Sequence, residues 1–390
     1  MVAVPEIERL GDEMTAWRRD LHAHPELAFE EVRTSGMVAE KLASWGLEVH
    51  RGLAKTGVVG VLRGSGGEGP MIGLRADMDA LPMQEANTFE HASTVAGKMH
   101  GCGHDGHTTM LLGAAKFLSE NRDFRGSVAF IFQPAEEGHG GGREMVREGL
   151  FDRFPCELVF GMHNWPELPT GEAAVMPGAM MAASDSVELV ITGKGGHAAM
   201  PHLSVDPVVV SAHVITALQT LTSRSVNPVN ASVVSICDMH AGVGAGNVIP
   251  QTVRLKGTAR AFDEDTRRTL EEGIERIATH VAQGLGAEAM VKYQRGYPPT
   301  VNDPAQAELA ATVLGEMLGA ENVHRDLPPC MGGEDFAFML EKRPGAYIWM
   351  GQAGGPSGCM VHNPRYDFND AILPIGASYW AKLVERVLGS

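Results

Sequence analysis

The 390-residue sequence lacks several features that would place it in a common protein class. It has five cysteines, and because no two of them have CxxC spacing, we expect neither a zinc ribbon nor a thioredoxin-type motif. No apolar run is long enough to span a bilayer, and the N-terminal residues do not join a basic region to an apolar core as a secretory signal does. The reducing cytoplasm is therefore the predicted location.

Basic residues are also few. The sequence has 32 Lys and Arg against 48 Asp and Glu, which gives a formal net charge of −16. A chain this acidic is a poor partner for nucleic acid or for an anionic membrane surface, so we expect neither. The length exceeds what one hydrophobic core usually supports, so we expect two domains.

Helices alternate with continuous apolar strands in the first third of the chain and near its end. The predicted strands are residues 58–62, 71–76, 127–132, 158–162 and 346–352. This alternation is typical of an α/β sheet covered on both faces. Between these parts, residues 183–296 follow the order β-α-β-β-α-β, the ferredoxin-like pattern. We therefore predict a discontinuous α/β domain, residues 1–182 and 297–390, with an inserted α+β domain, residues 183–296.

Residues that bind divalent metal ions follow several of the predicted strands. In open α/β sheets, ligands bind beyond the carboxyl ends of the strands, so one pocket could gather these groups. Thiolates, imidazoles and carboxylates are the usual ligands of zinc and related ions. The spread from Cys102 to His362, some 260 residues, favours a catalytic site over a structural one, with donors for two ions. The candidates are Asp77, Asp79, Cys102, His104, His107, Glu136, Glu137, His163 and His362.

Two adjacent glutamates sharpen this hypothesis. Neighbouring side chains of an extended chain point to opposite sides, so Glu136 and Glu137 cannot approach an ion in the same way. One of them can bind metal while the other handles the proton of a water molecule. By contrast, His22 and His24 lie far along the chain from these motifs, and we expect them in a structural helix.

An ordered set of motifs then resembles a known family, the M20 metallopeptidases, and within it the aminoacylase-like amidohydrolase branch of hippurate hydrolases, N-acyl-amino-acid deacylases and auxin-conjugate hydrolases. The motifs extend over nearly the whole chain. They are "RADMDALP", "MHGCGHDGHT", "QPAEEG", "GMHNWP", "GKGGHAAMPH", "GNVIP", "GTARAF", "GGEDFAF" and "HNPRYDFND". The resemblance implies a mixed sheet in the metal-binding domain and an insertion that serves as lid and dimerisation domain.

The resemblance also implies a site with two divalent ions, zinc or manganese, with cobalt or nickel tolerated. Glu136 would be the general base. Asp79 and Asp105 would orient the ligands by hydrogen bonds, although a direct chemical role for Asp105 stays open. The implied metal ligands are Cys102, which would bridge the two ions, His104, Glu137, His163 and His362.

Three residues of the insertion are expected near the substrate. His197 would stabilise the oxyanion, and whether it acts in its own chain or across a dimer is left open. Asn247 and Arg260 would bind the substrate, since an arginine fork suits the free carboxylate of an acylated amino acid. The resemblance further implies a homodimer through the insertion, with a tetramer as an alternative.

The predicted function is metal-dependent hydrolysis of the amide bond of N-acyl amino acids, which releases a carboxylic acid and a free amino acid. A dipeptidase or aminopeptidase on the same scaffold is one alternative. A metal-binding protein without turnover is another, although a binder needs no general base. A cysteine hydrolase that uses Cys102 and His104 is the last, and a thiolate that bridges two ions is not a free nucleophile.

Overall fold

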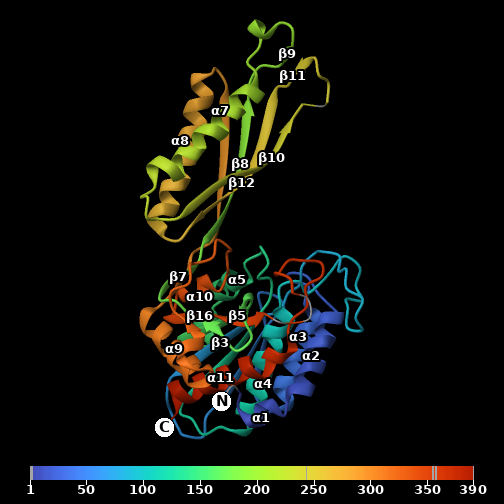
Figure 1. Cartoon of the computed structure of the whole chain (residues 1–390), viewed down its shortest axis with the longest axis vertical. Coiled ribbons are helices and arrows are strands. Elements are labelled where there is room, and N and C mark those ends of the chain that lie inside the picture. Colours follow the sequence, from blue (N-terminus) through green and yellow to red (C-terminus); the bar gives the residue numbers. More distant parts are fainter. Residues whose placement is uncertain (1–2, 243, 354, 356–357, 390) are drawn as a thin grey trace. The chain divides into compact units, whose positions relative to one another are not determined.

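The computed structural model describes residues 3–242, 244–353, 355 and 358–389 (Figure 1). The chain forms two compact units. The first unit comprises Met1–Met180, Val301–Pro328 and Asp335–Ser390, and the second comprises Met181–Thr300 and Pro329–Glu334. The segment Pro329–Glu334 therefore packs with the inserted part, which no pattern in the sequence indicated. The functions assigned above to the two domains stay predictions.

The first unit is built on a mixed eight-stranded sheet with the order β1-β2-β4-β3-β5-β16-β6-β15. Its central strands β4, β3, β5 and β16 run parallel, whereas β2 pairs antiparallel with both β1 and β4. The predicted mixed-sheet α/β class is thus confirmed. The strands are β1 (Glu48–Leu53), β2 (Gly57–Arg63), β3 (Met71–Asp77), β4 (Ser127–Gln133), β5 (Cys156–Pro169), β6 (Ala173–Ala174), β15 (Val323–His324) and β16 (Gly345–Ala353).

Helices pack against this sheet, and α4 and α11 also pack against each other. Helix α3 ends at Ser44, and after Gly46, which takes a φ of 77°, the chain enters β1. Two helices, α1 and α2, lie near the N-terminus. The helices are α1 (Pro5–Glu8), α2 (Gly11–Ala23), α3 (Val32–Ser44), α4 (His104–Glu120), α5 (Gly141–Arg147), α6 (Leu150–Arg153), α9 (Pro304–Leu318), α10 (Ala337–Leu340) and α11 (Leu373–Leu388).

The alternation of side chains along β3 separates the core of this unit from a buried polar layer. Ile72 and Leu74 are fully buried and belong to the hydrophobic cluster that includes residues of α4 and α11. Arg75 and Asp77 point to the opposite face of the sheet, because successive residues of a strand alternate between its faces. Both are buried too, so that face must pair its charges within the protein.

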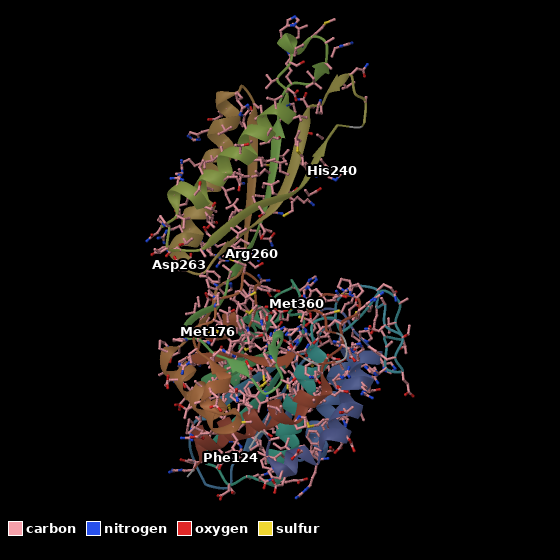
Figure 2. The ribbon with its side chains drawn as sticks, viewed as in Figure 1. Phe124, Met176, His240, Arg260, Asp263 and Met360 are labelled. Atoms are coloured by element: carbon pink, nitrogen blue, oxygen red, sulfur yellow. The ribbon has the colours of Figure 1, made fainter. Side chains whose placement is uncertain are left out.

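The second unit has the order β-α-β-β-α-β that the sequence pattern predicted. Helices α7 and α8 pack against a four-stranded antiparallel sheet with the order β10-β12-β8-β13. Asp263 (Figure 2) caps α8, since its side chain accepts a hydrogen bond from the Thr266 N–H at 2.8 Å. The elements are β8 (Ala183–Thr192), α7 (Pro207–Thr220), β10 (Ser232–Ala241), β12 (Thr252–Ala261), α8 (Glu264–Gly284) and β13 (Glu288–Tyr297), with the short strands β9 (Gly196–His197) and β11 (Val248–Ile249).

Two further short strands, β7 (Gly178–Met181) and β14 (Thr300–Asn302), lie where the chain passes between the units. Across the described ranges, no helix is both long enough and apolar enough to cross a membrane.

Candidate metal centre

A glycine-rich loop delivers Cys102 and His104 to the start of α4. Gly103 takes a φ of 103°, and a Cβ atom there would lie 2.1 Å from Oδ1 of Asn164. Only glycine fits this approach without displacing Asn164. The loop therefore packs directly on β5, and both Cys102 and His104 are buried.

Glu136 and Glu137 lie in the turn that follows β4. The carboxylate of Asp79 accepts hydrogen bonds from both of their backbone N–H groups, at 3.0 Å from Glu136 and 2.9 Å from Glu137. Nδ1 of His104 lies 2.9 Å from the Asp79 carbonyl oxygen and 3.2 Å from its carboxylate. Asp79 thus joins the two loops that carry three of the predicted site residues, and its orienting role stays a prediction.

His163 and His362 reach the same region from β5 and from the loop after β16. The backbone N–H of His362 donates to the Gly101 carbonyl at 2.7 Å, and His362 takes a φ of 63°. Nε2 of His362 lies 3.1 Å from Oε1 of Glu137, and Nε2 of His163 lies 3.4 Å from the Cys102 sulfur. Residues far apart in the sequence therefore meet at the carboxyl ends of parallel strands.

The five predicted ligands form two overlapping groups of potential metal donors. In one group the donor atoms of Cys102, His104 and His163 all lie within 4.8 Å of one another, and in the other those of Cys102, Glu137 and His362 do. Cys102 belongs to both groups, which is the arrangement that a thiolate bridging two ions requires. Glu136 joins His104 and Glu137 in a further group by the same criterion.

The hydrogen bonds of the two buried imidazoles fit a metal site. Nδ1 of His104 faces acceptors on Asp79 and Nδ1 of His163 lies 2.7 Å from the Asn164 carbonyl, so these nitrogens carry the protons. Within the described part of the chain, Nε2 of His104 has no hydrogen-bond partner although it is buried. Burial and the neighbouring His107 lower the pKa of His163 well below its ordinary value. Both rings thus turn a nitrogen toward Cys102, and the set of N, S and O donors suits zinc and related ions.

Unlike His163, the Cys102 thiol and the exposed His362 have raised pKa values. Burial and the carboxylate of Glu137 raise the pKa of Cys102, so the thiol stays protonated at neutral pH. Hydrogen bonds to Cys102 and Glu137 raise the pKa of His362 to about 10. A catalytic cysteine needs a lowered pKa, so this environment argues against Cys102 as a free nucleophile.

Asp77 lies beside the donor groups but is held by other partners. Arg75 donates to its carboxylate at 2.8 Å, and Nδ1 of His107 donates to it at 2.6 Å. Although burial alone raises its pKa, His104, His107 and Arg75 together lower the pKa of Asp77 well below its ordinary value. Asp77 and His107 thus support the loop of the site from the face of β3 that lies opposite the core.

Sequence reasoning missed the partner of Asp105. His22, which was expected to be only part of a structural helix, is fully buried and places Nδ1 2.8 Å from Asp105 and Nε2 3.2 Å from Glu85. Burial alone lowers the pKa of His22, but hydrogen bonds to Asp105 and Glu85 raise it to about 9. Arg18 lies 3.8 Å from the same Asp105 carboxylate. Asp105 therefore anchors the start of α4, and only the tertiary fold reveals this pairing.

The three predicted substrate residues all lie in the second unit. His197 and Asn247 come together, because β9 pairs with β11 and the Ala198 N–H donates to the Asn247 carbonyl at 3.0 Å. The side chains of His197 and Asn247 are exposed. Arg260 is half-buried near the end of β12 (Figure 2), and its Nη1 has no hydrogen-bond partner within the described residues. Arg260 is thus apart from the β9–β11 ribbon in this unit.

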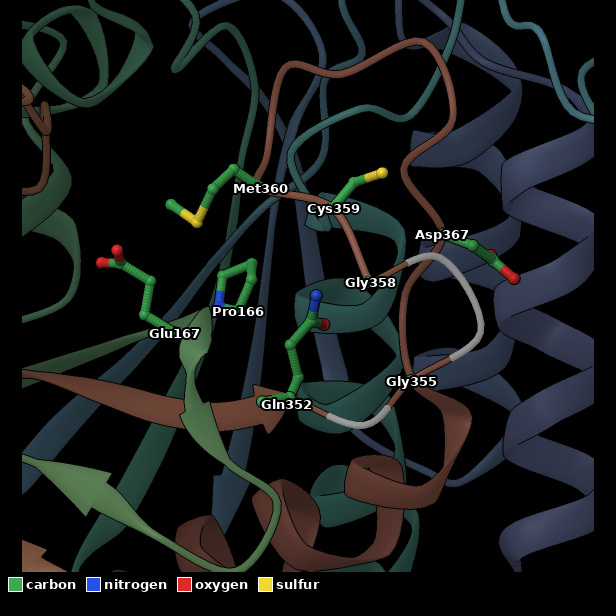
Figure 3. A pocket seen from close by; sticks show the side chains of 9 residues that line it. Pro166, Glu167, Gln352, Gly355, Gly358, Cys359, Met360 and Asp367 are labelled. Atoms are coloured by element: carbon green, nitrogen blue, oxygen red, sulfur yellow. The ribbon is translucent and has the colours of Figure 1, made fainter.

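A pocket of about 330 Å³ lies at the carboxyl-terminal ends of β5 and β16 (Figure 3). Pro166 and Glu167 line it from β5, and Gln352 lines it from β16. Met360, two residues before His362 in the sequence, forms another part of its wall. The pocket therefore lies at the same edge of the sheet as the candidate metal centre.

Comparison with known proteins identifies the family. The model of peptidase family M20/M25/M40 matches residues 73–386. The chain belongs to this family. It is 41% identical over 388 residues to a hippurate hydrolase of Campylobacter jejuni, with all of both chains covered. It is 47% identical over 304 residues to an N-acyl-L-amino acid amidohydrolase of Geobacillus stearothermophilus, which covers 76% of this chain and 81% of that one.

A solved structure gives the same assignment. A dinuclear metal-binding peptidase of the M20 family from Bacillus subtilis matches with a TM-score of 0.84 and 36% identity, over 98% of this chain and 99% of the other. The predicted membership in the M20 family is thus confirmed, and a divalent-metal site is consistent with the donor groups around Cys102.

Proposed function

We propose that this M20 protein is a metal-dependent amidohydrolase that cleaves the amide bond of N-acyl amino acids and releases a carboxylic acid and a free amino acid. The observation that carries the proposal is the shared position of Cys102 in two donor groups, with Glu136 beside them. The names of the relatives, a hippurate hydrolase and an N-acyl-L-amino acid amidohydrolase, support this substrate class.

In this proposal Cys102, His104, Glu137, His163 and His362 hold two divalent ions, zinc or manganese. Such ions, when bound, polarise the scissile carbonyl and lower the pKa of a bound water. Glu136 accepts the proton of the attacking water and passes it to the leaving amine. Two hydrogen bonds that fix Glu136 support this role. The backbone N–H of Asp335 lies 3.4 Å from the Glu136 carboxylate, and the backbone N–H of Glu136 donates to Asp79.

We assign the remaining groups to residues of the second unit, from the same chain or from the partner chain of a dimer. We assign His197 to the oxyanion, because its Nδ1 accepts a hydrogen bond from the Ala199 N–H at 3.1 Å, which leaves the proton on Nε2 for donation. We assign Asn247 and Arg260 to the free carboxylate of the substrate. A homodimer is proposed as well, since β10 is an edge strand in the sheet of the described residues and such edges can pair with a second copy. The cytoplasm stays the predicted location.

The proposal is tested with metal-stripped protein and a panel of N-acetyl amino acids, N-benzoyl amino acids and unblocked dipeptides. Cleavage that returns with Zn²⁺ or Mn²⁺ and is confined to acylated substrates is the expected result. Cleavage of dipeptides would move the protein to the peptidase alternative. Two bound ions per chain without turnover on any substrate would contradict the proposal and favour a binding protein.

Glu136→Gln tests the general base in the same assay. We expect kcat to fall by about 10²- to 10⁴-fold, the usual contribution of general acid–base catalysis, while the metal content is retained. Glu120→Gln, the same chemical change at the exposed end of α4, is the matched control and should keep full activity. Unchanged turnover in Glu136→Gln would remove this residue from the mechanism.

A further inference from the structure

A buried carboxylate outside the metal centre holds the turn that carries Glu136 and Glu137. Glu31 is fully buried. Its Oε1 accepts hydrogen bonds from the Phe29 N–H at 3.0 Å and from the Ala135 N–H at 2.9 Å. Its Oε2 accepts a hydrogen bond from the Thr56 hydroxyl at 2.6 Å. One side chain thus joins three segments that are distant in the sequence, and one of them leads directly into Glu136.

The three segments share an unfavourable backbone conformation. Non-glycine residues rarely adopt a positive φ, and holding one there costs of order 1–3 kcal/mol unless the surroundings enforce it. Within the described residues, the non-glycine residues with positive φ are Phe29 (62°), Ala54 (48°), Lys55 (68°), Ala135 (56°) and His362 (63°). The first four either donate to Glu31 or directly precede Thr56, which does. The strain is therefore concentrated around this one carboxylate.

We infer that Glu31 is a positioning residue of the active site: by accepting the Ala135 N–H it keeps Ala135 in the left-handed conformation that orients Glu136 and Glu137. This inference rests on the proposed function for its effect on turnover, but not for its effect on metal binding. Asp79 holds the N–H groups of Glu136 and Glu137, and Glu31 holds the residue before them. Three successive backbone N–H groups are thus bound by two buried carboxylates, which leaves the turn little freedom.

The reach of the side chain, more than its charge, is what this role requires. Burial raises the pKa of Glu31 to about 7, although its hydrogen bonds to Thr56 and Ala135 oppose this shift. A glutamine keeps an acceptor oxygen for the two N–H groups, and its NH₂ can donate to the Thr56 hydroxyl, which also accepts hydrogen bonds. An aspartate keeps the charge but is one methylene shorter, so it cannot reach all three partners.

The test compares Glu31→Asp with Glu31→Gln. For each variant, Zn²⁺ affinity is measured by competition with a chromogenic chelator, alongside kcat, KM and thermal unfolding of the metal-free protein. We expect Glu31→Asp to lose about tenfold or more in metal affinity and in kcat with little change in KM, because supporting partners of metal ligands typically contribute about 10- to 100-fold. Glu31→Gln should stay within about threefold of the wild type in both metal affinity and kcat, well below that range.

Two further variants separate positioning from general stability. Glu148→Asp is the matched control, because Glu148 also accepts a backbone N–H of a strained residue, that of Ala54 at 2.7 Å, without contacting Ala135. It should keep metal affinity and kcat. Ala135→Gly removes the conformational strain, so Glu31→Asp in that background should lose less than it does alone.

Each outcome bears on the inference. A folded Glu31→Asp with wild-type metal affinity and kcat would overturn it, as would equal losses in Glu31→Asp and Glu31→Gln. If Glu31→Asp does not fold, Glu31→Gln decides the question. A tenfold loss of Zn²⁺ affinity in Glu31→Gln, at an unchanged unfolding temperature, would overturn the inference. Retained Zn²⁺ affinity in this variant would support the inference. If the wild type itself cleaves no N-acyl amino acid, the proposed function fails, while the metal affinities still decide the inference.

Discussion

Asp79→Asn is the substitution whose effect follows most directly from the site. Oδ1 of Asp79 faces the Glu136 N–H and Nδ1 of His104, and Oδ2 faces the Glu137 N–H. Asparagine has almost the same shape, but one of the two oxygens becomes an NH₂ group, which only donates. Because both oxygens face donors, either orientation of the amide sets a donor against a donor. The variant therefore tests the hydrogen bonds with little change in volume.

The size of the effect follows from the lost pairing. A buried donor left without an acceptor costs about 1–3 kcal/mol. The metal-free protein can relax by letting the Glu136–Glu137 turn shift. The metal-bound protein needs His104 and Glu137 in place, so most of the cost falls on binding. Since about 1.4 kcal/mol corresponds to a factor of ten, Zn²⁺ affinity should fall by about 5- to 150-fold.

The measurement is a competition titration of metal-free protein with a chromogenic chelator, with thermal unfolding of both metal-free proteins alongside. Asp20→Asn is the control, because Asp20 is a partly exposed carboxylate that binds Arg33 on the surface. It should bind Zn²⁺ as the wild type does. If Asp79→Asn binds Zn²⁺ within about twofold of the wild type, less than about 0.5 kcal/mol, the orienting role of Asp79 is refuted.

Two further predictions concern titrating groups. His22→Ala should lower the free energy of unfolding of the metal-free protein by about 3–5 kcal/mol in denaturant titrations, because it leaves Asp105 buried without its partner. Because the pKa of His22 is raised to about 9, its contribution to the free energy of unfolding is complete below pH ~6.5 and is lost as the pH rises through ~9. The stability of the variant should therefore depend less on pH in this window. A pH dependence equal to that of the wild type would contradict the pairing. Metal binding at neutral pH should release about three protons per chain, from the Cys102 thiol, His104 and His362, because the pKa values of all three are raised. Calorimetry in buffers of different ionisation enthalpy measures this release, and a binding enthalpy independent of the buffer would exclude it.

The sequence could predict the sheet and the kinds of residue at its edge. The apolar runs of β2, β3 and β4 are continuous because these strands are buried on both faces, so their ends are visible in the hydrophobic pattern. Metal-binding residue types that follow such ends then stand out. The short strands β6, β9 and β15 have no such run, and the sequence analysis did not find them.

The partners of the site residues could not be predicted in the same way. Glu31 and Ala135 are 104 positions apart, and His22 and Asp105 are 83 apart. A buried carboxylate must find donors, but which donors it finds depends on how helices and loops pack, and no local period records that. The segment "LHAHP" therefore looks like an ordinary helix end in the sequence, and only the fold pairs its His22 with Asp105.

Asp77 and Asp79 are two positions apart in the sequence, yet the fold gives them different partners. Asp77, the last residue of β3, stays in the strand and pairs with Arg75 and His107. Asp79 lies after the strand has ended, where its carboxylate meets the Glu136–Glu137 turn and His104. The end of β3 thus determines which aspartate pairs with the charged side chains of the sheet and which one contacts the residues of the donor groups. Extending β3 by two residues would bring Asp79 into the strand on the same face as Asp77, because side chains alternate along a strand, and its carboxylate would leave the Glu136–Glu137 turn. The position at which this strand ends is therefore itself part of the candidate metal centre.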